Sequence, residues 1–97
     1  MAATRVAGAY VSGAGDTTVY TGSGRMDAIL ISNANAAAQT ITVKDGSTTI
    51  ATFDLYVSNS PIYIKFGEDK LDGIPFTTSL VVNPGSYAKV NVWYYGY

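Results

Sequence analysis

The chain has 97 residues, 13% of them charged, with a net charge of −1 and neither cysteine nor histidine. The absence of these two residue types excludes disulfides, thiolate and imidazole metal sites, and catalysis by a His-based triad or a thiolate. The six basic residues are scattered along the chain, which argues against nucleic-acid binding, because that needs clustered Lys and Arg.

The composition predicts one small globular domain over residues 1–97, since 47% of the residues are hydrophobic. The charged fraction is about half the usual share, and Thr, Ser, Asn and Tyr supply the polar surface instead. Such an exterior suits a protein that packs against neighbours. No run approaches the ~18 apolar residues of a membrane span, and residues 1–5 lack the apolar run of a secretion signal, so we expect synthesis in a cytoplasm and no membrane partner.

The first third of the chain predicts three strands, at residues 4–11, 17–21 and 25–33. Gly8 weakens the first or marks a bulge. In the strand at residues 17–21, alternation places Thr18 and Tyr20 on one face and Thr17, Val19 and Thr21 on the other. The third contains the run Ala28 to Ile31, which indicates burial on both faces. Turns are expected at residues 13–16 and 22–24, and a loop at residues 33–38.

Residues 39–55 form the strongest pattern, with β-branched and hydroxyl residues alternating on both sides of Asp45-Gly46. This pattern predicts a β-hairpin. A two-residue Asp45-Gly46 turn would pair Ile41 with Ile50 and send Phe53 to the opposite face. We favour a wider loop with Ile50 at its edge, because it gathers more apolar surface on one face. That face holds Ile41, Val43, Ala51, Phe53 and Leu55.

Three further strands are predicted in the second half. In residues 62–66, Ile62, Ile64 and Phe66 face the core, whereas Tyr63 and Lys65 face solvent. Residues 79–82 form the next strand and end at an Asn-Pro-Gly turn. Loops are expected at residues 56–61 and 67–75, and residues 76–78 are too short to assign. The last strand, residues 87–95, sets Ala88, Val90, Val92 and Tyr94 opposite Lys89, Asn91, Trp93 and Tyr95.

About eight strands with turn signals every ~8–12 residues predict an all-β fold, a single antiparallel sandwich or barrel. The seven acidic residues suggest no facing pair for acid–base catalysis, and most of them lie in predicted turns. The acidic cluster at residues 68–72 lacks EF-hand spacing and reads as a solvated loop. We therefore expect no enzymatic activity, no cofactor and no metal site.

The aromatic C-terminus, residues 93–97, is the one candidate working surface. Strand alternation turns one aromatic set away from the core, which gives Trp93 and Tyr95 a possible shared surface. Three interpretations stay open: Trp93 is buried in the core, the pair forms a protein interface, or the pair stacks on sugar rings.

The order of these features resembles the small β-sandwich virion proteins of tailed bacteriophages. The shared pattern runs from residues 19–22 and 28–33 through the 41–46 hairpin to Phe66-Gly67, residues 71–74 and residues 90–94. The resemblance implies a jelly-roll-like sandwich and a non-catalytic role as a capsid decoration (cement) protein, often assembled as a trimer on the head. It implies no functional residue that can be transferred one by one.

We therefore expect a structural virion protein on the capsid surface that bridges subunits of the major capsid protein and forms a homo-oligomer, with a trimer favoured. Its contact residues are expected to be Trp93, Tyr95 and Tyr97, with residues 2–5, including Thr4 and Arg5, as an arm. The alternatives are a carbohydrate-binding or host-attachment module, and a small tail or baseplate component.

Overall fold

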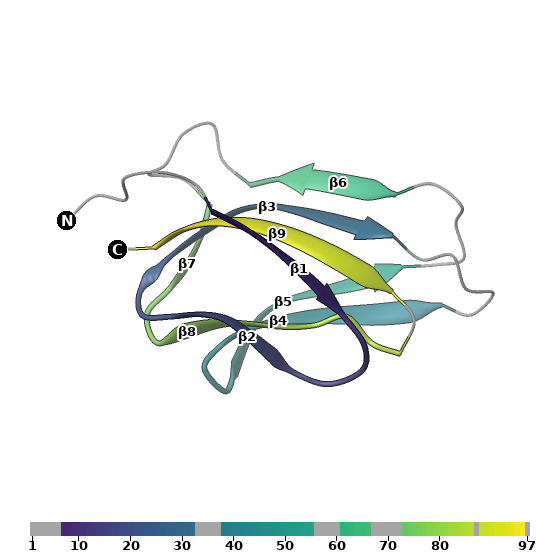
Figure 1. Cartoon of the computed structure of the whole chain (residues 1–97), viewed down its shortest axis with the longest axis horizontal. Coiled ribbons are helices and arrows are strands. Elements are labelled where there is room, and N and C mark those ends of the chain that lie inside the picture. Colours follow the sequence, from purple (N-terminus) through teal and green to yellow (C-terminus); the bar gives the residue numbers. More distant parts are fainter. Residues whose placement is uncertain (1–6, 33–37, 56–60, 67–72, 87, 97) are drawn as a thin grey trace.

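The computed structural model describes residues 7–32, 38–55, 61–66, 73–86 and 88–96, which form nine strands and no helix (Figure 1). The strands make two antiparallel sheets that pack face to face. The all-β prediction and the antiparallel β-sandwich are confirmed.

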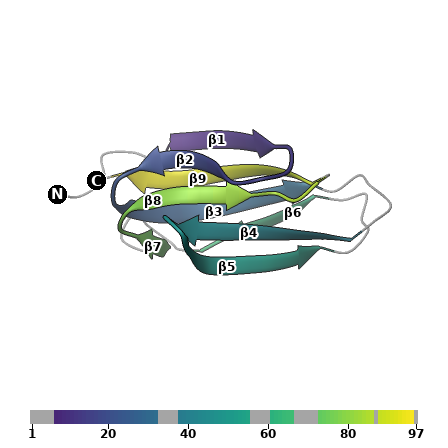
Figure 2. The ribbon, with the colours of Figure 1, turned by 90° about the horizontal axis from the view of Figure 1, so that it is seen from below.

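Sheet A lies above sheet B in Figure 1, and Figure 2 looks onto sheet B. Sheet A has the order β1 (Ala7–Ser12), β9 (Lys89–Gly96), β3 (Gly24–Ser32) and β6 (Ile62–Lys65). A further strand, β7 (Ile74–Phe76), pairs with residues 24–26 of β3, before the part of β3 that pairs with β6. Sheet B has the order β2 (Thr17–Thr21), β8 (Ser79–Asn83), β4 (Gln39–Asp45) and β5 (Thr48–Leu55). Among the described strands, only β4 and β5 are paired neighbours that also follow each other in sequence.

The core lies between the sheets and takes every second residue of the central strands, as the alternation predicts. In β9 the inner residues are Val90 and Val92, both fully buried, and Tyr94 packs beside them. Ala88, just before β9, is also buried, so the predicted face of this strand is confirmed. Among the described residues, the other large side chains that are fully buried are Met26, Ile29, Ile31, Ile41, Val43, Phe76, Leu80, Val82 and Pro84.

The central hairpin has the predicted faces but a different turn. Ile41 pairs with Phe53 and Val43 with Ala51, so the apolar set shares the inner face of sheet B. The predicted wider loop is wrong, because Asp45 pairs with Thr48 and only Gly46 and Ser47 form the turn. A bulge at Ile50 supplies the extra residue that corrects the register.

The predicted alternation of β2 is wrong, because the pairing with β8 shifts between Thr18 and Tyr20. This irregularity lets Val19 and Tyr20 both pack against the core. The Tyr20 ring lies 5.4 Å from the Tyr94 ring and 6.1 Å from the Phe76 ring, centroid to centroid.

The short strand β7 was not predicted and lies within residues assigned to a loop and to an unassigned piece. It places Phe76 in the core, where only 2% of its surface is exposed. At β6 the prediction of a buried inner face is too simple, because Ile62 is 39% exposed. The strand predicted over residues 4–11 appears as β1 from Ala7. The loops predicted at 33–38, 56–61 and 67–75 fall mainly outside the described residues.

Asp45 ties the hairpin to the turn between β7 and β8. Its carboxylate accepts hydrogen bonds from the backbone N–H groups of Thr77 at 2.9 Å, Thr78 at 2.8 Å and Ser79 at 3.3 Å. These hydrogen bonds hold the pKa of Asp45 below its ordinary value, and the bond from Thr77 contributes most. The carboxylate therefore joins two segments more than thirty residues apart in sequence.

Candidate functional site

The outer face of sheet A gathers aromatic side chains from three strands. Register places Gly8, Trp93, Ala28 and Lys65 in one row across the sheet, and Tyr10, Asn91, Leu30 and Tyr63 in the next. Tyr95 pairs with Arg25.

The aromatic residues on this face are partly exposed. Tyr10 and Tyr63 are each 58% exposed, and Trp93 and Tyr95 are half-buried. We call the surface formed by Tyr10, Tyr63, Trp93 and Tyr95 the outer aromatic face.

Trp93 is the centre of this surface. Its ring contacts that of Tyr63 edge to face, with centroids 6.0 Å apart and planes at 73°. On the other side its indole Nε1 lies 3.3 Å from the position a Cβ would take at Gly8, so the ring reaches across to β1. Ala28, between Trp93 and Lys65 in the row, is only 1% exposed. The Trp93 ring therefore packs over the sheet, between Tyr63 and the space above Gly8.

A cation sits at the edge of the outer aromatic face. Lys65 Nζ donates to both carboxylate oxygens of Asp27, at 2.8 and 2.9 Å. Asp27 lies at an irregularity in the pairing of β3 with β9, and its side chain is 11% exposed, against 44% for that of Lys65. The hydrogen bond with Asp27, together with the nearby Tyr63 and Tyr95, raises the pKa of Lys65. The ammonium group is thus held in place beside the aromatic rings.

The outer face of sheet B has a different character. Its strands present Thr40, Thr42 and Thr52, and Thr40 donates to Asp54 at 3.1 Å. The two described aromatic residues of sheet B, Tyr20 and Phe53, pack against the core instead. The two outer faces are therefore chemically distinct, one aromatic and one rich in hydroxyl groups.

Charge is also divided between the sheets. The described charges of sheet A are three cations and one anion, namely Arg25, Lys65, Lys89 and Asp27. Those of sheet B and the loop before β2 are one cation and three anions, namely Lys44, Asp16, Asp45 and Asp54. Lys44 Nζ lies 2.9 Å from Asp16 Oδ2, which lowers the pKa of Asp16. Within the described residues, sheet A is thus net positive and sheet B net negative.

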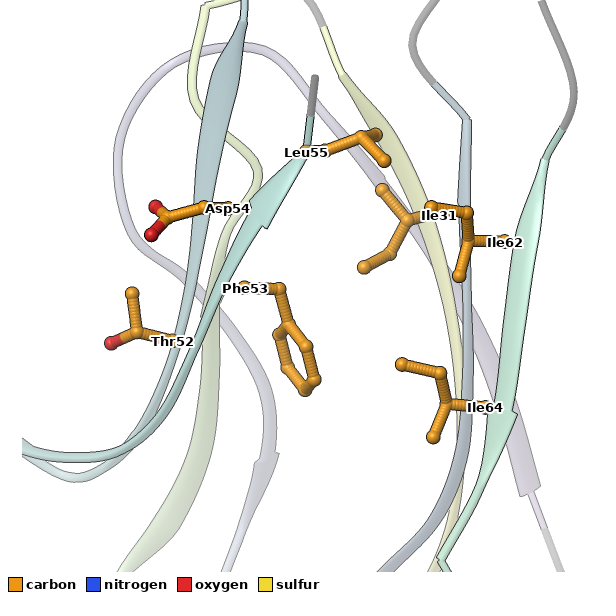
Figure 3. Close-up of a pocket in the computed structure, with 7 residues that line it drawn as sticks. All are labelled: Ile31, Thr52, Phe53, Asp54, Leu55, Ile62 and Ile64. Carbon is orange, nitrogen blue, oxygen red and sulfur yellow. The ribbon is translucent and has the colours of Figure 1, made fainter. Parts of the chain in front are cut away.

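The sandwich also has an apolar cleft of about 280 Å³ on the side where β5 and β6 are the edge strands (Figure 3). Phe53 and Leu55 line it from β5, Ile62 and Ile64 line it from β6, and Ile31 lies between Leu55 and Ile62. Thr52 and Asp54 point to the other side of β5. The cleft is where the two inner faces do not fully close on each other.

Two of the predicted contact residues can be located. Trp93 and Tyr95 share the outer face of sheet A, as their alternation predicted, so the interpretation of Trp93 as a core residue is wrong. Thr4, Arg5 and Tyr97, with the rest of the arm, lie outside the described residues, as does the acidic cluster 68–72. The sequence reasoning also placed Tyr63 and Lys65 on an outward face, but it did not connect them with Trp93.

The described residues hold no group of three or more acidic side chains that could bind a metal ion. No helix among them is long and apolar enough to cross a membrane. What the site offers is aromatic surface, a fixed ammonium group and tyrosine hydroxyls. Aromatic rings of this kind are enriched at protein interfaces.

Comparison with protein-family models, curated protein sequences and solved structures found no match to this chain.

Proposed function

We propose that this chain is a structural virion protein of a tailed bacteriophage, a decoration protein that stabilises the capsid by bridging major capsid subunits. The proposal rests on the resemblance of its strand and turn patterns to those of such proteins. It places the protein on the capsid surface as a homo-oligomer, preferably a trimer.

The strand order supports a jelly roll, the finer fold that this role implies. When β7 is set aside, consecutive strands lie in opposite sheets except for β4 and β5, and the sheet orders are β1-β9-β3-β6 and β2-β8-β4-β5. Eight strands in two packed sheets are consistent with a double-sheet jelly roll, an architecture found in viral capsid domains. The sparse charge is consistent with a protein that spends its life packed against neighbours.

The contrast between the two outer faces carries the proposal of a contact surface. Aromatic residues are enriched at protein interfaces because they bury a large area and keep a polar tip. The outer aromatic face has this composition, and the outer face of sheet B does not. A decoration protein acts by adding buried area across a subunit junction, and repetition over the shell multiplies the effect.

Binding to head particles that lack the protein tests this role. We expect the purified chain to cosediment with the particles and to raise the temperature at which they open. Trp93→Ala should weaken binding at least tenfold, since Trp is one of the residue types enriched among those that dominate interface energetics. Thr52→Ala on the exposed side of sheet B is the matched control and should bind as the parent chain does.

Two results would contradict the proposal. Failure of the parent chain to bind or stabilise head particles would overturn the decoration role. Equal binding by Trp93→Ala and Thr52→Ala would overturn the use of the outer aromatic face. Far-ultraviolet circular dichroism of each variant confirms that it is folded before binding is compared.

A further inference from the structure

The outer aromatic face combines two properties that a protein contact does not require together. It carries partly exposed rings in edge-to-face contact, and the described charges of its sheet are three cations and one anion. Lys65 stands one strand from Ala28 and two strands from Trp93 in the same row. Two strand spacings amount to about 10 Å, a span that one pyranose ring with its substituents fits.

We propose that this face binds a carboxylated saccharide, with a pyranose ring packed on Trp93 and Tyr63 and its carboxylate on Lys65. The C–H groups of a pyranose ring are apolar and slightly positive, and they pack well on the negative face of an aromatic ring. The planes of the two rings meet at 73°. They form a corner that contacts a sugar on two sides.

The polar half of the site is Lys65. Two of its three N–H donors are directed to Asp27, which leaves one donor for a ligand. Asp27 opposes the charge of the ligand, but its side chain is only 11% exposed, whereas that of Lys65 is 44% exposed. Of the two side chains, that of Lys65 is therefore the more accessible to an anion from solvent.

This inference does not rest on the virion role, because the free chain alone would bind the saccharide. Trp93 belongs to both proposals, so a saccharide and a capsid should exclude each other on one molecule. Titration with tetragalacturonic acid and with its neutral methyl ester, followed by the fluorescence of the lone Trp93, tests it. We expect the acid to change the emission and to bind at least fivefold more tightly than the ester, with a difference that shrinks in 0.5 M salt.

Two lysine variants form the matched control. Lys65 and Lys44 each make one ion pair with an aspartate, but on opposite sheets. Lys65→Ala should weaken binding of the acid roughly tenfold, as the loss of a hydrogen bond to a charged group does. Lys44→Ala should leave it unchanged.

The inference is overturned if the acid does not bind, if the ester binds equally well, or if both lysine variants lose affinity to the same extent. Capsid binding without saccharide binding would reject this inference and leave the proposed function standing. Saccharide binding without capsid binding would do the reverse.

Discussion

The indole ring of Trp93 reaches the neighbouring strand at Gly8, where an added Cβ would lie 3.3 Å from Nε1. Since Gly8 pairs with Trp93 in the register of β1 and β9, the missing side chain leaves room for the ring over the sheet. The outer aromatic face thus depends on a residue that contributes no side chain to it.

Replacing Gly8 by valine should displace the indole ring while the sandwich stays folded, because the glycine has no unusual backbone angle. We expect changed near-ultraviolet circular dichroism and a Trp93 emission shifted to longer wavelength. Ser12→Val, also on the outer side of β1 but two rows away, is the control. Identical spectra for Gly8→Val and the parent chain would show that the ring does not depend on this space.

Replacing Gly46 by alanine should destabilise the chain by about 1–2 kcal/mol. Gly46 has a φ of +62°, and a Cβ there would meet Thr78 only at the ordinary distance of 3.4 Å, so the cost is one of backbone strain. Urea unfolding measures it, with Ser47→Ala in the same turn as the control. If Gly46→Ala and Ser47→Ala have the same urea midpoint, Gly46 does not adopt the positive φ that the tight turn requires.

Phe76→Ala should cost about 3–5 kcal/mol, the usual range for a buried phenylalanine. Phe53→Ala should cost less, because Phe53 is half-buried and borders the open cleft, where water can fill the space. Urea unfolding of the two variants compares the sites directly. A smaller loss for Phe76→Ala would mean that β7 contributes little to the core.

Acid should destabilise the chain in part through Asp45. A carboxylate whose pKa is lowered by folding stabilises the native state above its unfolded pKa, and that contribution is lost as the pH falls through the folded value. The melting temperature of the parent chain should therefore fall below about pH 4. Asp45→Asn should melt lower than the parent at pH 7 and lose less on acidification. If the melting temperatures of the two chains fall in parallel from pH 7 to 2.5, the acid sensitivity comes from groups other than Asp45.

Sequence alternation predicted which residues share a face wherever a strand is regular. It assigned the inner and outer residues of β9, and the larger apolar set identified the inner face of the hairpin. Alternation did not predict the bulges. In the hairpin, Ile50 is one extra residue that shifts the register, and nothing in the sequence marks it as a bulge. The three-residue strand β7 is too short to show a period, so Phe76 was missed.

The candidate site could be predicted only in part, because its residues meet through strand order. Asp27 and Lys65 are 38 residues apart, and their ion pair exists because β3 and β6 are neighbours in sheet A. The alternation of residues predicted that Tyr63 and Trp93 face away from the core. It could not predict that their strands belong to the same sheet. The face on which a residue lies follows from its own strand, whereas the neighbours of that strand follow from the order of all the strands in the sheet.

The position of β9 in sheet A has a consequence for biosynthesis. Although it is the last described strand in sequence, β9 lies between β1 and β3 and pairs with both. A ribosome that has made residues 7–88 has therefore produced a chain in which β1 lacks its neighbour and sheet A is divided. Sheet A is completed after translation of this segment, and non-local pairing of this kind folds over milliseconds to seconds.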